Sequence, residues 1–379
     1  MPAYTELLHP IQRDTPPAHF ANERRIAIQN KLRNLNLDAF LITDIPIIRW
    51  LTGFTGSNAS VILNANDLWL ITDGRYTEQL KNELLLGFGF ISSEGLAHEL
   101  KVDSVTNGRL ATIHSIGFQS DKLSVSEFEK LKAATPQLEW NAQIGFFDEW
   151  VAAKSTVERD FIKAAVSITD KVFEKLLSLI TPQMTELDLA AEISYWNKKY
   201  GGEKDSFDPI VASGARSALP HARATKQRLL PNEMIVIDMG TVYQGYCSDQ
   251  TRTIVLGKAS QKAREAYQNV LEAHLLGIAS LEPNKTGEEI DSIVRNYFST
   301  KGLDKFFTHS LGHSIGIQVH ENPILGRNRK MTLPLGATVT IEPGLYFSGE
   351  FGIRIEDIVE VTAFGGDPYP KAPKHLIEL

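Results

Sequence analysis

The sequence lacks the features that mark secreted, membrane-bound or nucleic-acid-binding proteins. It has one cysteine, Cys247, so no disulfide can form within the chain, and a reducing compartment is expected. No segment approaches the roughly 20 apolar residues of a membrane helix, and the opening Met1-Pro-Ala-Tyr-Thr-Glu resembles no signal peptide. The formal net charge is −7 and no Lys/Arg-rich block stands out, which argues against nucleic acid or a membrane as partner. We therefore expect a soluble, cytoplasmic protein.

The 379 residues do contain two regions of different pattern, as expected for two domains. Residues 1–150 alternate helical and strand patterns. These patterns predict helices over 20–37 and 76–85, strands over 39–43, 61–63, 68–72 and 111–116, and a helix opened by the capping box Ser124–Glu127. This alternation is typical of an α/β domain.

In residues 151–379, a pair of helices followed by a strand hairpin occurs twice. The predicted helices cover 155–180, 185–200, 261–281 and 286–302. The repetition suggests two structurally similar halves. The fold class predicted for the whole chain is α/β, with mixed α+β character in the second domain.

Each predicted hairpin carries a pair of carboxylates. If the first hairpin turns at Tyr243-Gln244, Asp238 lies opposite Asp249; if the second turns at Gly349, Glu342 lies opposite Glu356. Directly opposed side chains have Cβ atoms about 4.5–5.5 Å apart, where like charges are destabilising. Two such pairs in one domain call for a counter-charge, which two divalent cations would supply.

Three histidines stand between the hairpins, in the glycine-punctuated segment His309-Ser-Leu-Gly-His313-Ser-Ile-Gly-Ile-Gln-Val-His320. Neutral imidazole is a common metal ligand. The oxygen-rich candidate set is Asp238, Asp249, His313, Glu342 and Glu356. Hard carboxylate ligands favour Mn²⁺, although Co²⁺ and Zn²⁺ also occupy such sites. Two ions would activate a water between them, so the set predicts metal-assisted hydrolysis.

Each of these features also has a simpler interpretation. An Asp pair alone is more often a solvated turn, and a lone histidine is more often a packed or surface residue. Cys247 is expected to be a small core residue rather than a catalytic thiol. The metal-site hypothesis depends on the two hairpins and the histidine segment occurring together.

The ordered motifs carry a specific resemblance. They are Ile237-Asp-Met-Gly, Cys247-Ser-Asp-Gln-Thr-Arg, His309-Ser-Leu-Gly-His, Ile341-Glu-Pro-Gly-Leu-Tyr and Arg354-Ile-Glu-Asp. Together they resemble the pita-bread metallopeptidases. The stretch from Phe207 to His221 is similar to the Xaa-Pro aminopeptidase (aminopeptidase P) and prolidase branch. In residues 1–150, Trp50-Leu-Thr-Gly-Phe-Thr-Gly-Ser and Thr72-Asp-Gly-Arg-Tyr are similar to a creatinase-type N-terminal domain.

The resemblance implies a role for each matching residue. Asp238 would be a terminal ligand of one ion, and Asp249 and Glu356 would bridge both ions. His313 and Glu342 would hold the second ion, and Glu342 would also shuttle the proton of the attacking water.

Further residues would contact or support the substrate and the ligands. His221 and His320 would orient the peptide and stabilise the oxyanion, and His309 would line the proline pocket. Arg354 and Tyr346 would support Asp238. The expected substrate-binding set is His221, His309, His320 and Arg354.

The resemblance therefore implies a dinuclear aminopeptidase that acts on peptides with proline at the second position. It would remove the residue before the proline, and the attacking group would be a hydroxide between its two ions. The resemblance also implies a homodimer. A prolidase, acting on Xaa-Pro dipeptides, shares every ligand and is the nearest alternative. A metal-free creatinase-type hydrolase and a non-catalytic binding protein of the same fold are further alternatives, which the complete ligand set disfavours. A methionine aminopeptidase would leave residues 1–150 unexplained.

Overall fold

The computed structural model describes residues 6–7, 11–12, 16–102 and 112–379. The chain divides into two compact units, Met1–Phe147 and Asp148–Leu379. Met1 to Thr5, which enter the expectation of no signal peptide, lie outside the described residues. So does Ala111, the first residue of one predicted strand.

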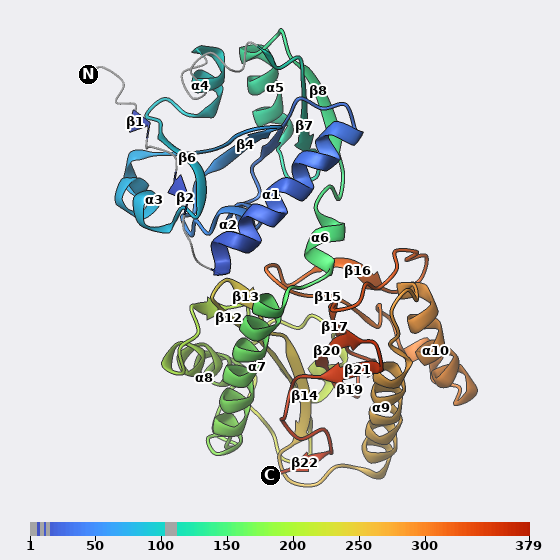
Figure 1. Cartoon of the computed structure of the whole chain (residues 1–379). Helices are drawn as coiled ribbons and strands as arrows, with labels where there is room; N and C mark the ends of the chain where they lie inside the picture. Colours follow the sequence, from blue (N-terminus) through green and yellow to red (C-terminus); the bar gives the residue numbers. More distant parts are fainter. Residues whose placement is uncertain (1–5, 8–10, 13–15, 103–111) are drawn as a thin grey trace. The chain divides into compact units, whose positions relative to one another are not determined.

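The first unit is built on a mixed eight-stranded sheet. Its strands are β1 (Glu6–Leu7), β2 (Ile11–Gln12), β3 (Ala39–Ile42), β4 (Ser60–Asn64), β5 (Leu68–Thr72), β6 (Leu86–Ile91), β7 (Ser115–Gln119) and β8 (Glu139–Gln143). Its helices are α1 (Pro16–Asn34), α2 (Ile45–Thr52), α3 (Thr77–Glu83), α4 (Leu96–Val102) and α5 (Val125–Ala134). The strand order is β1-β6-β5-β4-β3-β7-β8, with β2 paired to β6 (Figure 1). Buried side chains of the sheet pack against Leu100 of α4 and Leu131 of α5.

The sequence patterns located most, but not all, of these elements. The strands predicted over 39–43, 61–63 and 68–72 are confirmed as β3, β4 and β5, and the Ser124 capping box opens α5. The sequence analysis did not identify α2, β6 or β8. In β6, the sequence Leu-Gly-Phe-Gly-Phe-Ile contains Gly87 at φ 88°, and glycine weakens a strand pattern.

The second unit combines four long helices with several small sheets. Its helices are α6 (Asp148–Ala152), α7 (Thr156–Leu177), α8 (Glu186–Lys199), α9 (Gln261–Ser280) and α10 (Gly287–Thr300). Its strands are β9 (Lys204–Asp205), β10 (Ile210–Ser213), β11 (Met234–Met239), β12 (Thr241–Tyr243), β13 (Tyr246–Cys247), β14 (Gln250–Val255), β15 (Gly312–Ser314), β16 (Glu321–Leu325), β17 (Thr338–Ile341), β18 (Gly344–Phe347), β19 (Phe351–Arg354), β20 (Asp357–Thr362), β21 (Gly365–Pro368) and β22 (Ile377–Glu378). Among the described residues, no helix is both long enough and apolar enough to cross a membrane.

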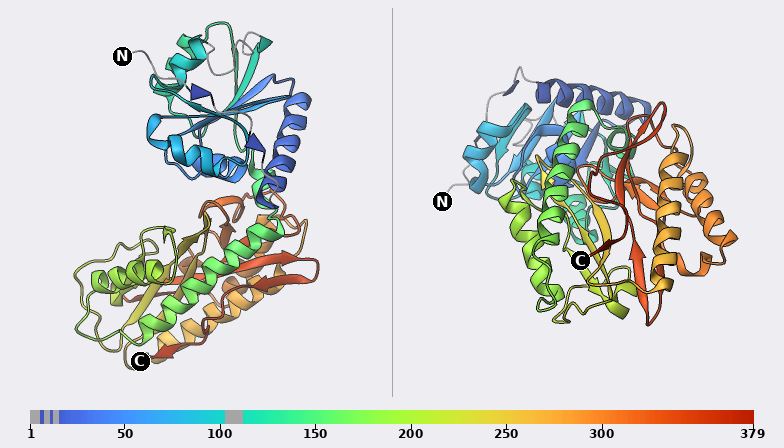
Figure 2. Two further views of the ribbon diagram at one scale, coloured as in Figure 1. Left: turned by 60° about the vertical axis from the view of Figure 1, so that its left-hand side comes forward. Right: turned by 90° about the horizontal axis from the view of Figure 1, so that it is seen from below.

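Two helix pairs flank the strands of this unit (Figures 1 and 2). One core joins α7 and α8 to β10, β11 and β14, and a second core joins α9 and α10 to β16, β17 and β20. The predicted order of two helices followed by a hairpin, repeated once, is confirmed. The structural similarity of the two halves stays a prediction. The hairpins lie on the inner side of each helix pair, where their carboxylates can meet.

Candidate metal centre

The first hairpin brings its two aspartates to one face of the sheet, but in a different register from the one predicted. Asp238 pairs with Thr251, and Tyr243 pairs with Tyr246. The turn is therefore Gln244-Gly245, where both residues have positive φ (49° and 85°), as tight two-residue hairpin turns require. The predicted turn at Tyr243-Gln244 was wrong. Because the register differs by two residues, Asp249 lies diagonal to Asp238 on the same face rather than directly opposite.

The second hairpin has the predicted register. Ile341 pairs with Asp357 at the end of the β17–β20 ladder, and Gly344 pairs with Arg354 at the start of the β18–β19 ladder. The two ladders share one register, so Glu342 and Glu356, in the gap between them, stand opposite each other. A hairpin centred on Gly349 therefore places two acids face to face.

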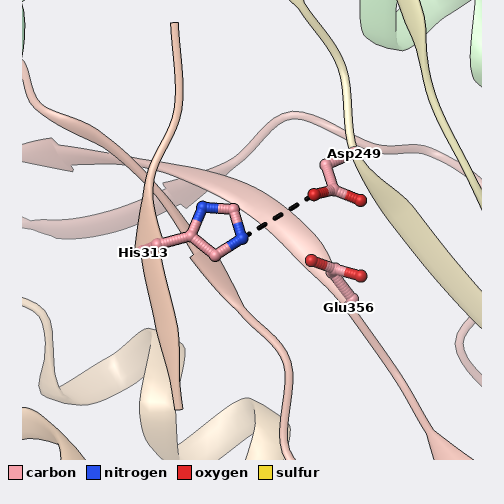
Figure 3. Close-up of side chains that lie close together, drawn as sticks. All are labelled: Asp249, His313 and Glu356. Carbon is pink, nitrogen blue, oxygen red and sulfur yellow. Dashed lines mark ion pairs between the residues drawn. The ribbon is translucent and has the colours of Figure 1, made fainter. Parts of the chain in front are cut away.

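His313 reaches the same place from β15. Its Nε2 lies 3.5 Å from Oε1 of Glu342 and 3.8 Å from Oδ2 of Asp249. Its Nδ1 lies 3.1 Å from the carbonyl oxygen of Ser314. A hydrogen bond donated by Nδ1 fixes the tautomer in which Nε2 carries the free lone pair. Figure 3 shows His313, Asp249 and Glu356 pointing toward one another, with ligand atoms within 4.8 Å.

The acids at this point raise one another's pKa values. Burial raises the pKa of Asp249 well above its usual value, and the charge of Glu356 raises it further. Burial also raises the pKa of Glu356 well above its usual value and that of Glu342 to about 8. Burial lowers the pKa of His313 to about 4, so this imidazole is neutral near pH 7. Buried acids that compete for protons beside a neutral imidazole form a donor set suited to divalent cations.

Asp238 supports the same conclusion. Arg354 Nη2 lies 2.5 Å from its Oδ2, whereas its buried Oδ1 has no hydrogen-bond partner among the described residues. An unpartnered buried carboxylate oxygen is costly unless a ligand binds it. This donor set fits a divalent metal site, and the two-ion arrangement of all five residues stays a prediction.

Arg354 and Thr251 hold the acids in place. Arg354 donates through Nε to the Thr251 hydroxyl (2.9 Å) and through Nη1 to Tyr346 Oη (3.0 Å). The Thr251 hydroxyl in turn donates to Oε2 of Glu356 (2.6 Å). Arg354 therefore contacts Asp238 directly, and Tyr346 acts through Arg354. Since each guanidinium nitrogen already donates within the protein, a substrate contact by Arg354 stays a prediction.

All five candidate ligands line one cavity of about 530 Å³, together with His221 and His320. His309 is not among the described residues that line this cavity. Its Nε2 lies 2.9 Å from Tyr346 Oη and its Nδ1 lies 2.8 Å from the Ser310 carbonyl oxygen. The structure thus brings His221 and His320 to the cavity, and the role of His309 in the proline pocket stays a prediction.

The sequence analysis did not assign several residues of the cavity wall. They are Leu187, Ala190, Asp208, Pro209, Ile210 and Arg223. The only available signal was the position of three of them in the stretch from Phe207 to His221, which had been noted for its resemblance alone. The wall is formed by α8 and by the start of β10, which are far from the ligands in sequence.

Comparisons with known proteins identify the families that the two regions of the chain match. Residues 160–363 match metallopeptidase family M24, and residues 24–149 match the creatinase/prolidase N-terminal domain. The chain is 34% identical over 356 residues to the Xaa-Pro dipeptidase of Pyrococcus horikoshii, covering 94% of this chain and 99% of that protein. It is 35% identical over 349 residues to the putative Xaa-Pro aminopeptidase of Mycoplasma genitalium, covering 88% and 92%.

A similar solved structure is the Xaa-Pro dipeptidase from Bacillus anthracis, with a TM-score of 0.89 and 35% identity over 95% of this chain and all of that one. These matches confirm the predicted fold class, in which a creatinase-type N-terminal domain precedes a pita-bread metallopeptidase domain. They also confirm the resemblance to the Xaa-Pro peptidase branch. The chain is therefore a member of metallopeptidase family M24.

Proposed function

We propose that the protein hydrolyses the peptide bond that precedes proline, using two divalent metal ions. The observation that carries the proposal is the convergence of three buried carboxylates, the partly buried Glu342 and the Nε2 atom of His313 on one cavity. Proline-containing bonds need a dedicated site because proline lacks an N–H and has a fixed φ. The family and the names of the relatives support this substrate class.

We assign the ligands as the resemblance implies. Asp238 would hold one ion, His313 and Glu342 would hold the other, and Asp249 and Glu356 would contribute to both. When bound, the ions supply an activated water and a Lewis acid for the scissile carbonyl. The oxygen-rich set favours Mn²⁺, with Co²⁺ and Zn²⁺ as alternatives. A homodimer and a cytoplasmic location stay predictions of the sequence.

The chain's own groups handle the proton and the substrate. Glu342, which lines the cavity beside His313, would accept a proton from the attacking water and return it to the leaving prolyl nitrogen. This transfer balances the reaction: a C–O bond forms, the C–N bond breaks, and the water's proton ends on nitrogen. His221 and His320, both exposed on the cavity wall, are placed to hydrogen-bond the peptide and its oxyanion.

The dipeptidase form is the one we propose first, because relatives named Xaa-Pro dipeptidase include both the Pyrococcus protein and the Bacillus anthracis structure. The aminopeptidase form, ranked first from sequence, is the second candidate. It is favoured by the Mycoplasma relative and by the X-Pro aminopeptidase structure from Thermotoga maritima.

Hydrolysis of Leu-Pro, Leu-Pro-Gly and Leu-Ala by the Mn²⁺-loaded protein tests this proposal. We expect cleavage of Leu-Pro, weaker cleavage of Leu-Pro-Gly and none of Leu-Ala. Preference for the tripeptide would select the aminopeptidase. Cleavage of neither proline peptide by metal-loaded protein would contradict the proposed function and favour a non-catalytic binding protein.

A further inference from the structure

Lys154 is a cation buried in the second unit. Its side chain is 1% exposed, and its Nζ donates to Oε2 of Glu321 (2.8 Å) and to the hydroxyl of Ser314 (2.9 Å). The Glu321 side chain is 2% exposed. Lys154 follows α6, near the start of the second unit.

Both partners of Lys154 lie next to histidines of the site. Ser314 follows His313 on β15, and Glu321 follows His320 at the start of β16. Ser314 and Glu321 pair across the β15–β16 ladder, with a register irregularity between His313 and Ser314. Lys154 therefore bridges the two ends of the loop over 315–320, which we call the histidine loop.

The middle of the histidine loop is hydrogen-bonded to the same ion pair. Oε1 of Glu321 accepts a hydrogen bond from the amide of Gln318 (3.0 Å), whose carbonyl oxygen accepts one from the amide of Gly316 (3.0 Å). A Cβ atom on Gly316 would lie 2.7 Å from Cε of Lys154. The lysine stem thus occupies the space beside Gly316, and the loop closes tightly around it.

The start of α6 is attached to β16, just after the histidine loop. The side-chain Nδ2 of Asn322, the residue after Glu321, donates to Oδ2 of Asp148 (2.8 Å) at the start of α6. The backbone of Lys154 is held as well, because its amide donates to the carbonyl oxygen of Gly336 (3.2 Å). The cation therefore reaches the loop from a fixed backbone.

Stability alone does not account for this arrangement. The cost of removing two charges from water can exceed their attraction, so an apolar pair of similar volume often stabilises a protein equally well. The ion pair adds positional control, because its hydrogen bonds fix both ends and the middle of the histidine loop in one conformation. At the end of the loop, the His320 ring lies 4.4 Å from that of His313, centroid to centroid.

We propose that Lys154, acting through Glu321, is a positioning residue that sets the place of His320 beside the candidate ligand His313. It acts on the histidine loop and contacts neither substrate nor metal. The activity readout of this proposal rests on the proposed function, whereas the structural readout does not.

The test compares Lys154→Met, the double variant Lys154→Met/Glu321→Met and the control Lys163→Met. Lys163 is 46% exposed, pairs with Glu360 at 3.4 Å and has no part in the site. Lys154→Met alone leaves Glu321 buried without its cation and is expected to be unstable. The double variant removes both charges, so we expect an unfolding midpoint near that of the wild type.

In the folded double variant, we expect the amides of Gly316 and Gln318 to exchange hydrogen faster than in the wild type. We also expect kcat on a proline peptide to fall about tenfold, the lower end of the range for losing a group that orients a catalytic residue. KM should change by less than about twofold. The control Lys163→Met should match the wild type in hydrogen exchange and in kcat. Wild-type exchange and wild-type kcat in the double variant would overturn the proposal. If the wild-type protein cleaves no proline peptide, the proposed function fails, and the exchange comparison still decides the role of Lys154.

Discussion

Arg354 donates a hydrogen bond to one carboxylate oxygen of Asp238, and the other oxygen has no hydrogen-bond partner among the described residues. The Nη2 atom of Arg354 lies 2.5 Å from Oδ2 of Asp238, and the second oxygen is the buried Oδ1. The guanidinium offsets part of the negative charge that the four acids collect. The remaining charge and the free oxygen are what a metal ion would satisfy.

Removing this guanidinium should harm the metal-free protein more than the loaded one. We expect Arg354→Met to destabilise metal-free protein by about 3–5 kcal/mol, because it leaves Asp238 buried and unpaired beside other acids. Saturating Mn²⁺ should reduce the loss, since the ions then supply the counter-charge. Denaturant unfolding with and without Mn²⁺ measures both values. Arg264→Met, which breaks an exposed pair with Glu378, serves as control and should cost about 0–1 kcal/mol. Equal losses in Arg354→Met with and without metal would argue against a metal site.

Asp249→Asn should abolish metal binding without destabilising the metal-free protein. The change removes a buried negative charge from a set of mutually repelling acids, so metal-free stability should stay equal or rise. Activity should fall by more than the roughly 10–100-fold typical of losing a residue that only orients a ligand. Metal analysis, unfolding and a proline-peptide assay on the same preparation check the three parts. Retained hydrolysis would contradict the assigned ligand role.

The stability of the protein in acid should depend on His309. Burial and, second to it, the charge of Arg354 lower the pKa of His309 to about 3. In the unfolded chain, histidine takes up a proton near pH 6.5. The unfolded state therefore binds more protons between pH 6.5 and 3, so stability is lost as the pH falls through this window.

His309→Gln should consequently lose less stability than the wild type between pH 7 and pH 4.5. Urea unfolding at the two pH values measures this difference, and the exposed His98→Gln provides the control. A variant whose pH dependence equals that of the wild type would show that His309 is not buried as a neutral group.

Gly312→Ala should displace the strand that carries His313. A Cβ atom at residue 312 would overlap the carbonyl oxygen of Thr340 on β17. We expect a loss of about 1–3 kcal/mol, as for other overpacked sites, and weaker Mn²⁺ binding. Calorimetric titration and thermal unfolding measure the two effects. Gly74→Ala is the control, because nothing lies within 4 Å of its added Cβ. If Gly312→Ala is destabilised but binds Mn²⁺ as tightly as the wild type, the position of this strand does not control the metal site.

The two hairpins show what could and could not be predicted from the sequence. The second was correctly registered because Gly349 stands at equal distance from Glu342 and Glu356. The first was misplaced by two residues because the turn residues Gln244-Gly245 were not recognised as the tight turn. The side-chain period of two nevertheless kept both aspartates on one face, so the predicted site survived the error.

Tertiary packing decided the remaining differences. His309 belongs to the same segment as His313 and His320, but its ring bonds to Tyr346, and His309 is not among the described residues that line the cavity. The wall residues of α8 come from a distant helix, and no local pattern relates Leu187 to the ligands. The role of Lys154 was likewise invisible, since its partner Glu321 is 167 residues away in the chain.

The most direct test of the account is to measure metal content and hydrolysis together. The protein is stripped with a chelator, titrated with Mn²⁺, and assayed on Leu-Pro and Leu-Pro-Gly at each point. The account predicts that activity is absent from the stripped protein and reaches its maximum at two ions per chain, with no recovery in Asp249→Asn. Full hydrolysis by the stripped protein would contradict it.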